Sequence, residues 1–90
     1  MATGLQRMLQ LALALGADEL RLVPAPGHSR GMQVVVVETG GRPIVVGGDV
    51  AVWFGELDEP HTEGQLRVRA LDPELVWLAH EREPWRPRSV

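Results

Sequence analysis

Side chains able to carry out chemistry are few in this sequence, and four of them gather in one acidic segment. Asp58, Glu59, His61 and Glu63 fall within six residues. Carboxylate oxygens and imidazole nitrogens bind divalent cations, so the segment has the donor types of a metal site. Its spacing matches no known metal-binding loop. We therefore interpret the segment as a solvated acidic turn and assign no metal to it.

A second short segment, His28-Ser29-Arg30, brings an imidazole, a hydroxyl and a guanidinium together. Ser29 beside His28 is a poor nucleophile pair, because neighbours in sequence rarely reach the geometry of proton transfer. No acidic residue is placed to orient the histidine. Arg30 has the charge to pair with an anionic ligand. The segment is therefore a candidate ligand loop, and no catalytic role is assigned to it.

The composition removes most other kinds of active site. The chain contains no cysteine and no tyrosine, and its nine basic residues are all arginine. Without cysteine and lysine there is no disulfide, thiolate nucleophile, P-loop or Schiff base. We therefore expect no enzyme activity and no cofactor. The arginine bias indicates GC-rich codons or a thermophile that avoids deamidation-prone side chains, and we expect a bacterial protein.

Length and charge indicate one soluble cytoplasmic domain. The 90 residues carry a net charge of −3 and are 44% apolar, which is unlike a disordered chain. An acidic chain also argues against nucleic-acid binding, which needs a dense basic face. No apolar run approaches the ~20 residues of a membrane span, and we expect no membrane insertion. Residues 1–83 are interpreted as the domain, and residues 84–90 as a Pro/Arg-rich tail.

The first element that the sequence predicts is a helix over residues 3–15. Thr3 and Gln6 fit a capping box, and Gly16 is typical of a helix end. One apolar stripe recurs at helical spacing, formed by Leu5, Met8, Leu9, Ala12 and Leu15. Leu11 and Leu13 lie off that stripe, so the apolar arc is wider than a one-sided helix needs. We take these two leucines as candidate interaction residues for self-association.

The middle of the chain predicts about five strands. Alternating or β-branched residues fill the ranges 19–23, 32–38, 43–46, 50–57 and 65–71. Glycine pairs at 40–41 and 47–48 are typical of tight turns, so neighbouring strands should pair mostly antiparallel. Asp72-Pro73 then predicts the start of a C-terminal helix that ends before Pro84. The expected fold is α+β: an N-terminal helix, about five mostly antiparallel strands and a C-terminal helix.

The three tryptophans receive different interpretations. Trp53 and Trp77 fall inside regular elements, and we expect them in the core or half-buried. Trp85 lies between Pro84 and Pro87 in the C-terminal tail. Such a residue either clamps the tail onto the domain or docks onto a partner, and Trp85 is a third candidate interaction residue.

The first half of the chain resembles the amino-terminal domain of the type II secretion and type IV pilus motor ATPases. The residues that carry the resemblance are the apolar helix, then Gly16-Ala17-Asp18-Glu19-Leu20-Arg21-Leu22, and later Gly48-Asp49-Val50. It covers residues 5–50, about half the chain. The ATPase core is missing, since a Walker lysine cannot exist in a chain without lysine. The resemblance implies a stand-alone accessory domain that makes protein contacts without hydrolysis.

These observations predict a non-catalytic protein–protein interaction or regulatory module whose partner is another protein or a second copy of the chain. The alternative is a small-ligand-binding domain with a pocket between sheet and helix. That alternative depends on the run of four valines at 34–37 and on the loop that carries His28, Ser29 and Arg30.

Overall fold

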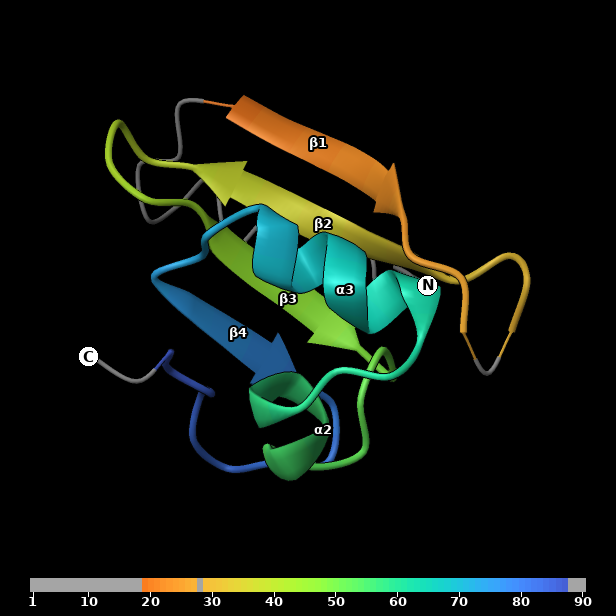
Figure 1. The fold of residues 1–90 in the computed structure, drawn as a ribbon. Coiled ribbons are helices and arrows are strands. Elements are labelled where there is room, and N and C mark those ends of the chain that lie inside the picture. The colour runs from red at the N-terminus through yellow and green to blue at the C-terminus, as the bar shows by residue number, and fades with distance from the viewer. Residues whose placement is uncertain (1–18, 28, 88–90) are drawn as a thin grey trace, which may run out of the picture.

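The computed structural model describes residues 19–27 and 29–87. They form strands β1 (Glu19–Pro24), β2 (Gln33–Glu38) and β3 (Ile44–Gly48), helices α2 (Gly55–Asp58) and α3 (Glu63–Ala70), and strand β4 (Leu75–Leu78) (Figure 1). The fold is α+β as expected, with a sheet of four strands instead of about five. The helix expected at residues 3–15 lies outside the described residues.

The sheet is mixed, with its strands in the order β1-β2-β3-β4. β1 pairs antiparallel with β2, and β2 pairs antiparallel with β3. The β2–β3 hairpin turns at the first glycine pair, where Gly40 has a φ of 87° that side chains rarely adopt. β4 lies parallel to β3. A parallel neighbour needs a long crossover connection, and this one contains α2 and α3.

The expected strand at 65–71 is wrong, because these residues belong to helix α3. The Thr62 hydroxyl accepts a hydrogen bond from the Gln65 backbone N–H at 3.1 Å, and the Gln65 side chain accepts one from the Thr62 N–H at 3.3 Å. This reciprocal capping box starts a helix. The alternation of Leu66 and Val68 with arginines concealed it. Val68 is fully buried, whereas Leu66 is 54% exposed, as helical spacing allows.

The expected strand at 50–57 and the expected C-terminal helix are also wrong. Val50 and Ala51 enter the core, and the chain then bends into the short helix α2. Asp72 has a φ of 52°, far from the extended conformation of a helix N-cap. The residues after it form β4, in which Val76 and Leu78 are buried on one face. The run Leu-Val-Trp-Leu is typical of a strand that carries apolar side chains on both faces.

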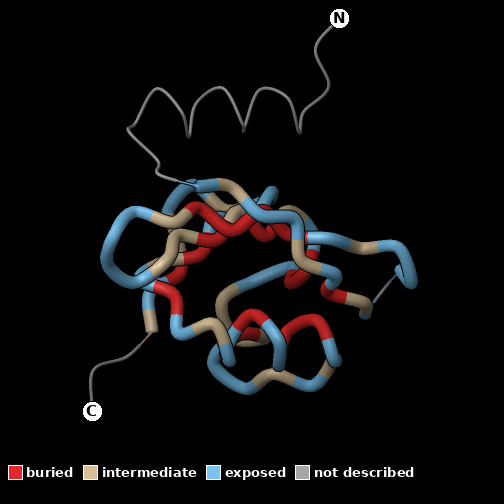
Figure 2. The backbone as a smooth tube through the Cα atoms, turned by 90° about the horizontal axis from the view of Figure 1, so that it is seen from above, coloured by how far each residue is buried: buried red, intermediate tan, exposed pale blue. Residues whose placement is uncertain are grey.

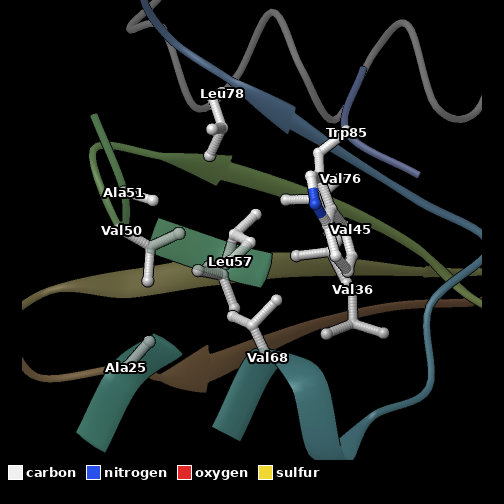
Figure 3. Packing of buried hydrophobic residues seen from close by; sticks show 11 residues of the cluster. Ala25, Val36, Val45, Val50, Ala51, Leu57, Val68, Val76, Leu78 and Trp85 are labelled. Atoms are coloured by element: carbon white, nitrogen blue, oxygen red, sulfur yellow. The ribbon is translucent and has the colours of Figure 1, made fainter. Parts of the chain in front are cut away.

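The hydrophobic core lies between the sheet and the two helices (Figures 1 and 3). Strand side chains and helix side chains point toward one another there, and all are at most 5% exposed; they are Ala25, Val34, Val36, Val45, Val50, Ala51, Leu57, Val68, Val76, Leu78 and Trp85. Gln65 is the buried polar residue of this region, and its amide donates to the Val50 carbonyl at 3.1 Å. The hydrogen bond compensates for burying the amide.

The opposite side of the sheet, called the outer face below, is also apolar. The strand register places eight apolar side chains on it: Leu20, Leu22, Val35, Val37, Ile44, Val46, Leu75 and Trp77. Both described helices lie on the other side of the sheet (Figures 1 and 2). Nevertheless, Val35 and Val37 in the centre of the outer face are only 2% and 5% exposed.

Candidate interaction site

The acidic segment is divided among separate contacts in the structure. His61 Nε2 lies 3.5 Å from Glu56 Oε2, and Glu63 forms an ion pair with Arg67 at 2.7 Å. Asp58 accepts a hydrogen bond from an indole of the C-terminal segment. Within residues 19–27 and 29–87, no group of three or more histidine and acidic side chains is arranged to hold a metal ion. Asp58, His61 and Glu63 thus form separate contacts around α2 and α3.

The candidate ligand loop joins β1 to β2. His28 lies outside the described residues, and Ser29 and Arg30 are exposed. The base of the loop is fixed to α3, because the Gly64 N–H donates to the Pro26 carbonyl at 2.6 Å. A Cβ at Gly64 would overlap the Ala25 carbonyl, so this close approach requires glycine. The loop therefore meets the start of α3 at its base and exposes Ser29 and Arg30 at its tip.

Trp85 closes the C-terminal segment onto the domain. It is 2% exposed, and its backbone N–H and carbonyl both bond to Val76 at 2.8 Å. Its indole Nε1 donates to Asp58 Oδ1 at 3.0 Å. The Arg69 guanidinium lies 5.4 Å from the ring centroid, within the range of a cation–π contact. Of the two roles considered for Trp85, the structure shows the clamp.

An open hollow lies beside this clamp and is lined by Phe54, Asp58, Glu83, Pro84, Trp85 and Arg86. One of its polar groups, the Asp58 carboxylate, already accepts a hydrogen bond from the Trp85 indole. Ligand pockets usually combine an apolar enclosure with convergent polar groups. This hollow has apolar and polar side chains in its lining but is open to solvent and does not enclose a ligand, so it is a poor candidate for a small-ligand site.

Trp53 is the feature that the sequence interpretation missed. It was expected in the core or half-buried, but it is 60% exposed, and its neighbour Val52 is 54% exposed. The pair stands at the bend that leads into α2. A Cβ at Gly55 would overlap the Trp53 ring, so the indole lies directly against the first residue of α2. We call Val52, Trp53 and Gly55 the tryptophan corner.

Hydrogen bonds around Glu56 hold the tryptophan corner in place. The Val52 N–H donates to Glu56 Oε1 at 2.6 Å, and the Glu56 N–H donates to the Trp53 carbonyl at 3.2 Å. The other carboxylate oxygen of Glu56 accepts from the buried Gln65 amide at 3.4 Å. The tryptophan corner is therefore connected by hydrogen bonds to Glu56 of α2 and, through Glu56, to Gln65 of α3. The exposed indole is attached to a backbone that these hydrogen bonds hold.

The type and spacing of residues carried a signal for this arrangement. A glycine directly after Trp53-Phe54 interrupts the alternation of a strand and leaves room for an aromatic ring against the backbone. Glu56, four residues after Val52, is also placed to accept that residue's N–H. Leu11 and Leu13, the other candidate interaction residues, lie outside the described part of the chain.

Comparison with known proteins finds no family whose model matches this chain and no curated protein that matches it. Across the described ranges 19–27 and 29–87, no helix combines the length and the apolar character needed to cross a membrane.

Proposed function

We propose that this chain is a non-catalytic protein–protein interaction module that contacts its partner through the tryptophan corner. The observation that carries the proposal is Trp53, a large aromatic side chain held against Gly55 and still 60% exposed. A small domain gains stability by burying its aromatic side chains, and Trp85 shows that this fold can bury one completely. An indole left on the surface therefore suits an intermolecular contact.

The physical properties of the corner fit a contact centre. Tryptophan is enriched among the few residues that dominate binding energy at interfaces, where truncation typically costs ~2 kcal/mol or more. The ring lies against α2 before binding, so less side-chain entropy is lost when a partner covers it. Exposed polar residues such as Glu59 and His61 follow on the next turn and would form the polar rim of such an interface.

A second copy of this chain is the first partner to consider. An interface between identical copies needs only the surface that each copy already presents. Leu11 and Leu13 would add apolar area to such a contact, if they belong to the same surface. The resemblance to the accessory domain of secretion and pilus motor ATPases supports the same class of role, because it implies contacts between proteins without catalysis.

The test compares two exposed tryptophans on opposite sides of the molecule. Trp53→Ala removes the proposed contact, and Trp77→Ala, on the outer face, removes a tryptophan that is 42% exposed. Sedimentation velocity over a wide concentration range reports self-association, and quantitative affinity capture from the source organism reports other partners. We expect Trp53→Ala to lose an association that Trp77→Ala retains. A monomeric chain whose captured proteins are identical for all three forms would contradict the proposal.

The small-ligand alternative has no comparable observation in its favour. Among the described residues, the space between the sheet and helices α2 and α3 is filled by the core side chains (Figure 3).

A further inference from the structure

The two edges of the sheet differ in their backbone pairing. The edge of β4 is paired with the C-terminal segment, because the N–H and the carbonyl of Val76 both bond to Trp85 at 2.8 Å. β1 forms the other edge, at the upper margin of the sheet in Figure 1, and among the described strands it pairs with β2 alone. An open strand edge presents backbone N–H and carbonyl groups to which another strand can bond.

The hydrogen-bond pattern identifies the backbone groups at the β1 edge. The Ala25 N–H, directly after β1, donates to the Met32 carbonyl at 2.8 Å and continues the register of β1 with β2. Because the backbone groups of successive residues point to opposite sides of a strand, those of Leu20, Leu22 and Pro24 point away from β2. Proline has no N–H to donate. Leu20 and Leu22 therefore carry the N–H and carbonyl groups that can bond to an added strand.

We propose that β1 pairs antiparallel with β1 of a second copy, about a two-fold axis at Leu20, and so joins two sheets into one. In this register the Leu20 residues of the two copies lie opposite each other, and their N–H and carbonyl groups exchange two hydrogen bonds. The surface involved is separate from the tryptophan corner, and the proposal does not depend on the role of Trp53.

The charges of β1 fit this register. Glu19 lies directly opposite Glu38 of β2, an arrangement of like charges that destabilises a sheet. Arg21 pairs with Glu38 at 2.8 Å, and the salt bridges among the described residues include none to Glu19. Pairing about Leu20 places Arg21 of each copy directly opposite Glu19 of the other, on the same face of the sheet. The second copy thus supplies the cation that Glu19 lacks among its described neighbours.

The other registers within Glu19–Pro24 are less favourable. An axis at Arg21 would place the Arg21 side chains of the two copies opposite each other. An axis at Leu22 would place Leu20 opposite Pro24, which cannot donate a hydrogen bond. An axis between two residues would place Leu20 opposite a residue whose backbone groups face β2. The sequence of β1 therefore favours the axis at Leu20.

The test changes the charges of β1 one at a time and then mixes the variants. Glu19→Arg makes β1 basic at both charged positions, and Arg21→Glu makes it acidic at both. Arg82→Glu is the matched control, because it reverses the charge of an exposed arginine outside β1. Sedimentation velocity measures the association of each full-length variant, alone and in equal mixture, and denaturation curves show that each is folded.

We expect the unmodified chain and Arg82→Glu to self-associate equally. Glu19→Arg and Arg21→Glu should each self-associate on the order of tenfold more weakly, because like charges then face each other between the copies. Their mixture should recover the affinity, since a basic β1 then meets an acidic one. A monomeric unmodified chain, or a mixture that associates no more tightly than either variant alone, would overturn the proposal.

Trp53→Ala separates this association from the one proposed for the tryptophan corner. Pairing through β1 should survive Trp53→Ala, because Trp53 lies at the bend into α2 and outside the sheet. If Trp53→Ala abolished all self-association, the second copy would bind through the tryptophan corner, and the β1 proposal would be wrong.

Cysteine cross-linking tests the register without changing any charge. The chain has no cysteine, so Leu20→Cys and Leu22→Cys each introduce a single thiol. The Cα atoms of a hydrogen-bonded pair lie ~5.5 Å apart, within the range of a disulfide, whereas the two copies of position 22 would lie ~14 Å apart. We expect Leu20→Cys to form a covalent dimer at least about tenfold faster than Leu22→Cys under mild oxidation. Equal or reversed rates would overturn the proposal.

Discussion

One tryptophan lies at each end of helix α2, and the two have opposite environments. At the C-terminal end, Trp85 is 2% exposed, its indole donates to Asp58 and Arg69 lies over its ring. At the N-terminal end, Trp53 is 60% exposed and lies against Gly55. The same type of side chain thus completes the core at one end of a single helical turn and remains on the surface at the other.

The difference separates residues that stabilise this fold from residues free to serve a partner. Trp85 has its polar group satisfied and its apolar surface buried, so it contributes to folding. Trp53 contributes little burial; its ring lies against Gly55, and the hydrogen bonds of Glu56 hold the backbone of Val52 and Trp53. Changes at one end of α2 should therefore affect stability, and changes at the other end should affect association.

Trp85→Ala should give the largest effect on stability. Removing a buried indole leaves a cavity between β4 and α2 and should lower the free energy of unfolding by about 3–5 kcal/mol. Chemical denaturation followed by circular dichroism measures this change. Trp77→Ala is the matched control and should cost much less, because Trp77 is 42% exposed. If Trp85→Ala and Trp77→Ala lowered the free energy of unfolding equally, buried Trp85 would not stabilise the fold more than exposed Trp77 does.

Asp58→Ala should have the next largest effect. It leaves the Trp85 indole N–H without its acceptor in a partly buried setting, which should cost about 1–2 kcal/mol. Asp58→Asn keeps an oxygen acceptor at the same position and should recover most of that loss. The measurement is again the free energy of unfolding. If alanine and asparagine were equally destabilising, the hydrogen bond would not be what holds Trp85.

Gly55→Ala should change stability by less than about 1 kcal/mol, because alanine favours a helix and the exposed indole can move aside. The added methyl group would occupy the place of the Trp53 ring and displace it. Association through the tryptophan corner should therefore fall while the domain stays folded. Sedimentation or binding measurements beside a denaturation curve would show the two effects. If Gly55→Ala kept full association, the contact between the Trp53 indole and Gly55 would not be needed for association.

The first three strands could be predicted from the sequence because their local signals agree with their tertiary environment. The four valines of β2 suit a strand that is apolar on both faces, and the glycine pair at 40–41 supplies the turn to β3. Their predicted ends lie within two residues of the observed ends.

The second half of the chain was mispredicted because local pattern and tertiary environment conflict there. In α3, Leu66 and Val68 alternate with arginines as in a strand, but the Thr62–Gln65 capping box prevails. β4 follows an Asp-Pro pair that usually begins a helix, yet its four residues pair with β3 at long range. The sequence of β4 carries no local signal for this pairing, because its parallel partner β3 is separated from it in the chain by α2 and α3.

The candidate site could be predicted only in part for a related reason. A sequence identifies tryptophan as apolar, but exposure depends on which surfaces the fold leaves uncovered. Trp85 between prolines was recognised as a residue with two roles, and burial decided between them. Trp53 was assigned to an alternating strand at 50–57. Its exposure could not be predicted, because it depends on the bend into α2, which the sequence analysis did not predict.

The most direct test of the account is the association of the unmodified chain and of Trp53→Ala, measured side by side by sedimentation and by quantitative capture. The account predicts that Trp53→Ala unfolds at nearly the same denaturant concentration as the unmodified chain but loses its partner, whether a second copy or another protein. An unchanged set of associations for Trp53→Ala would contradict the account.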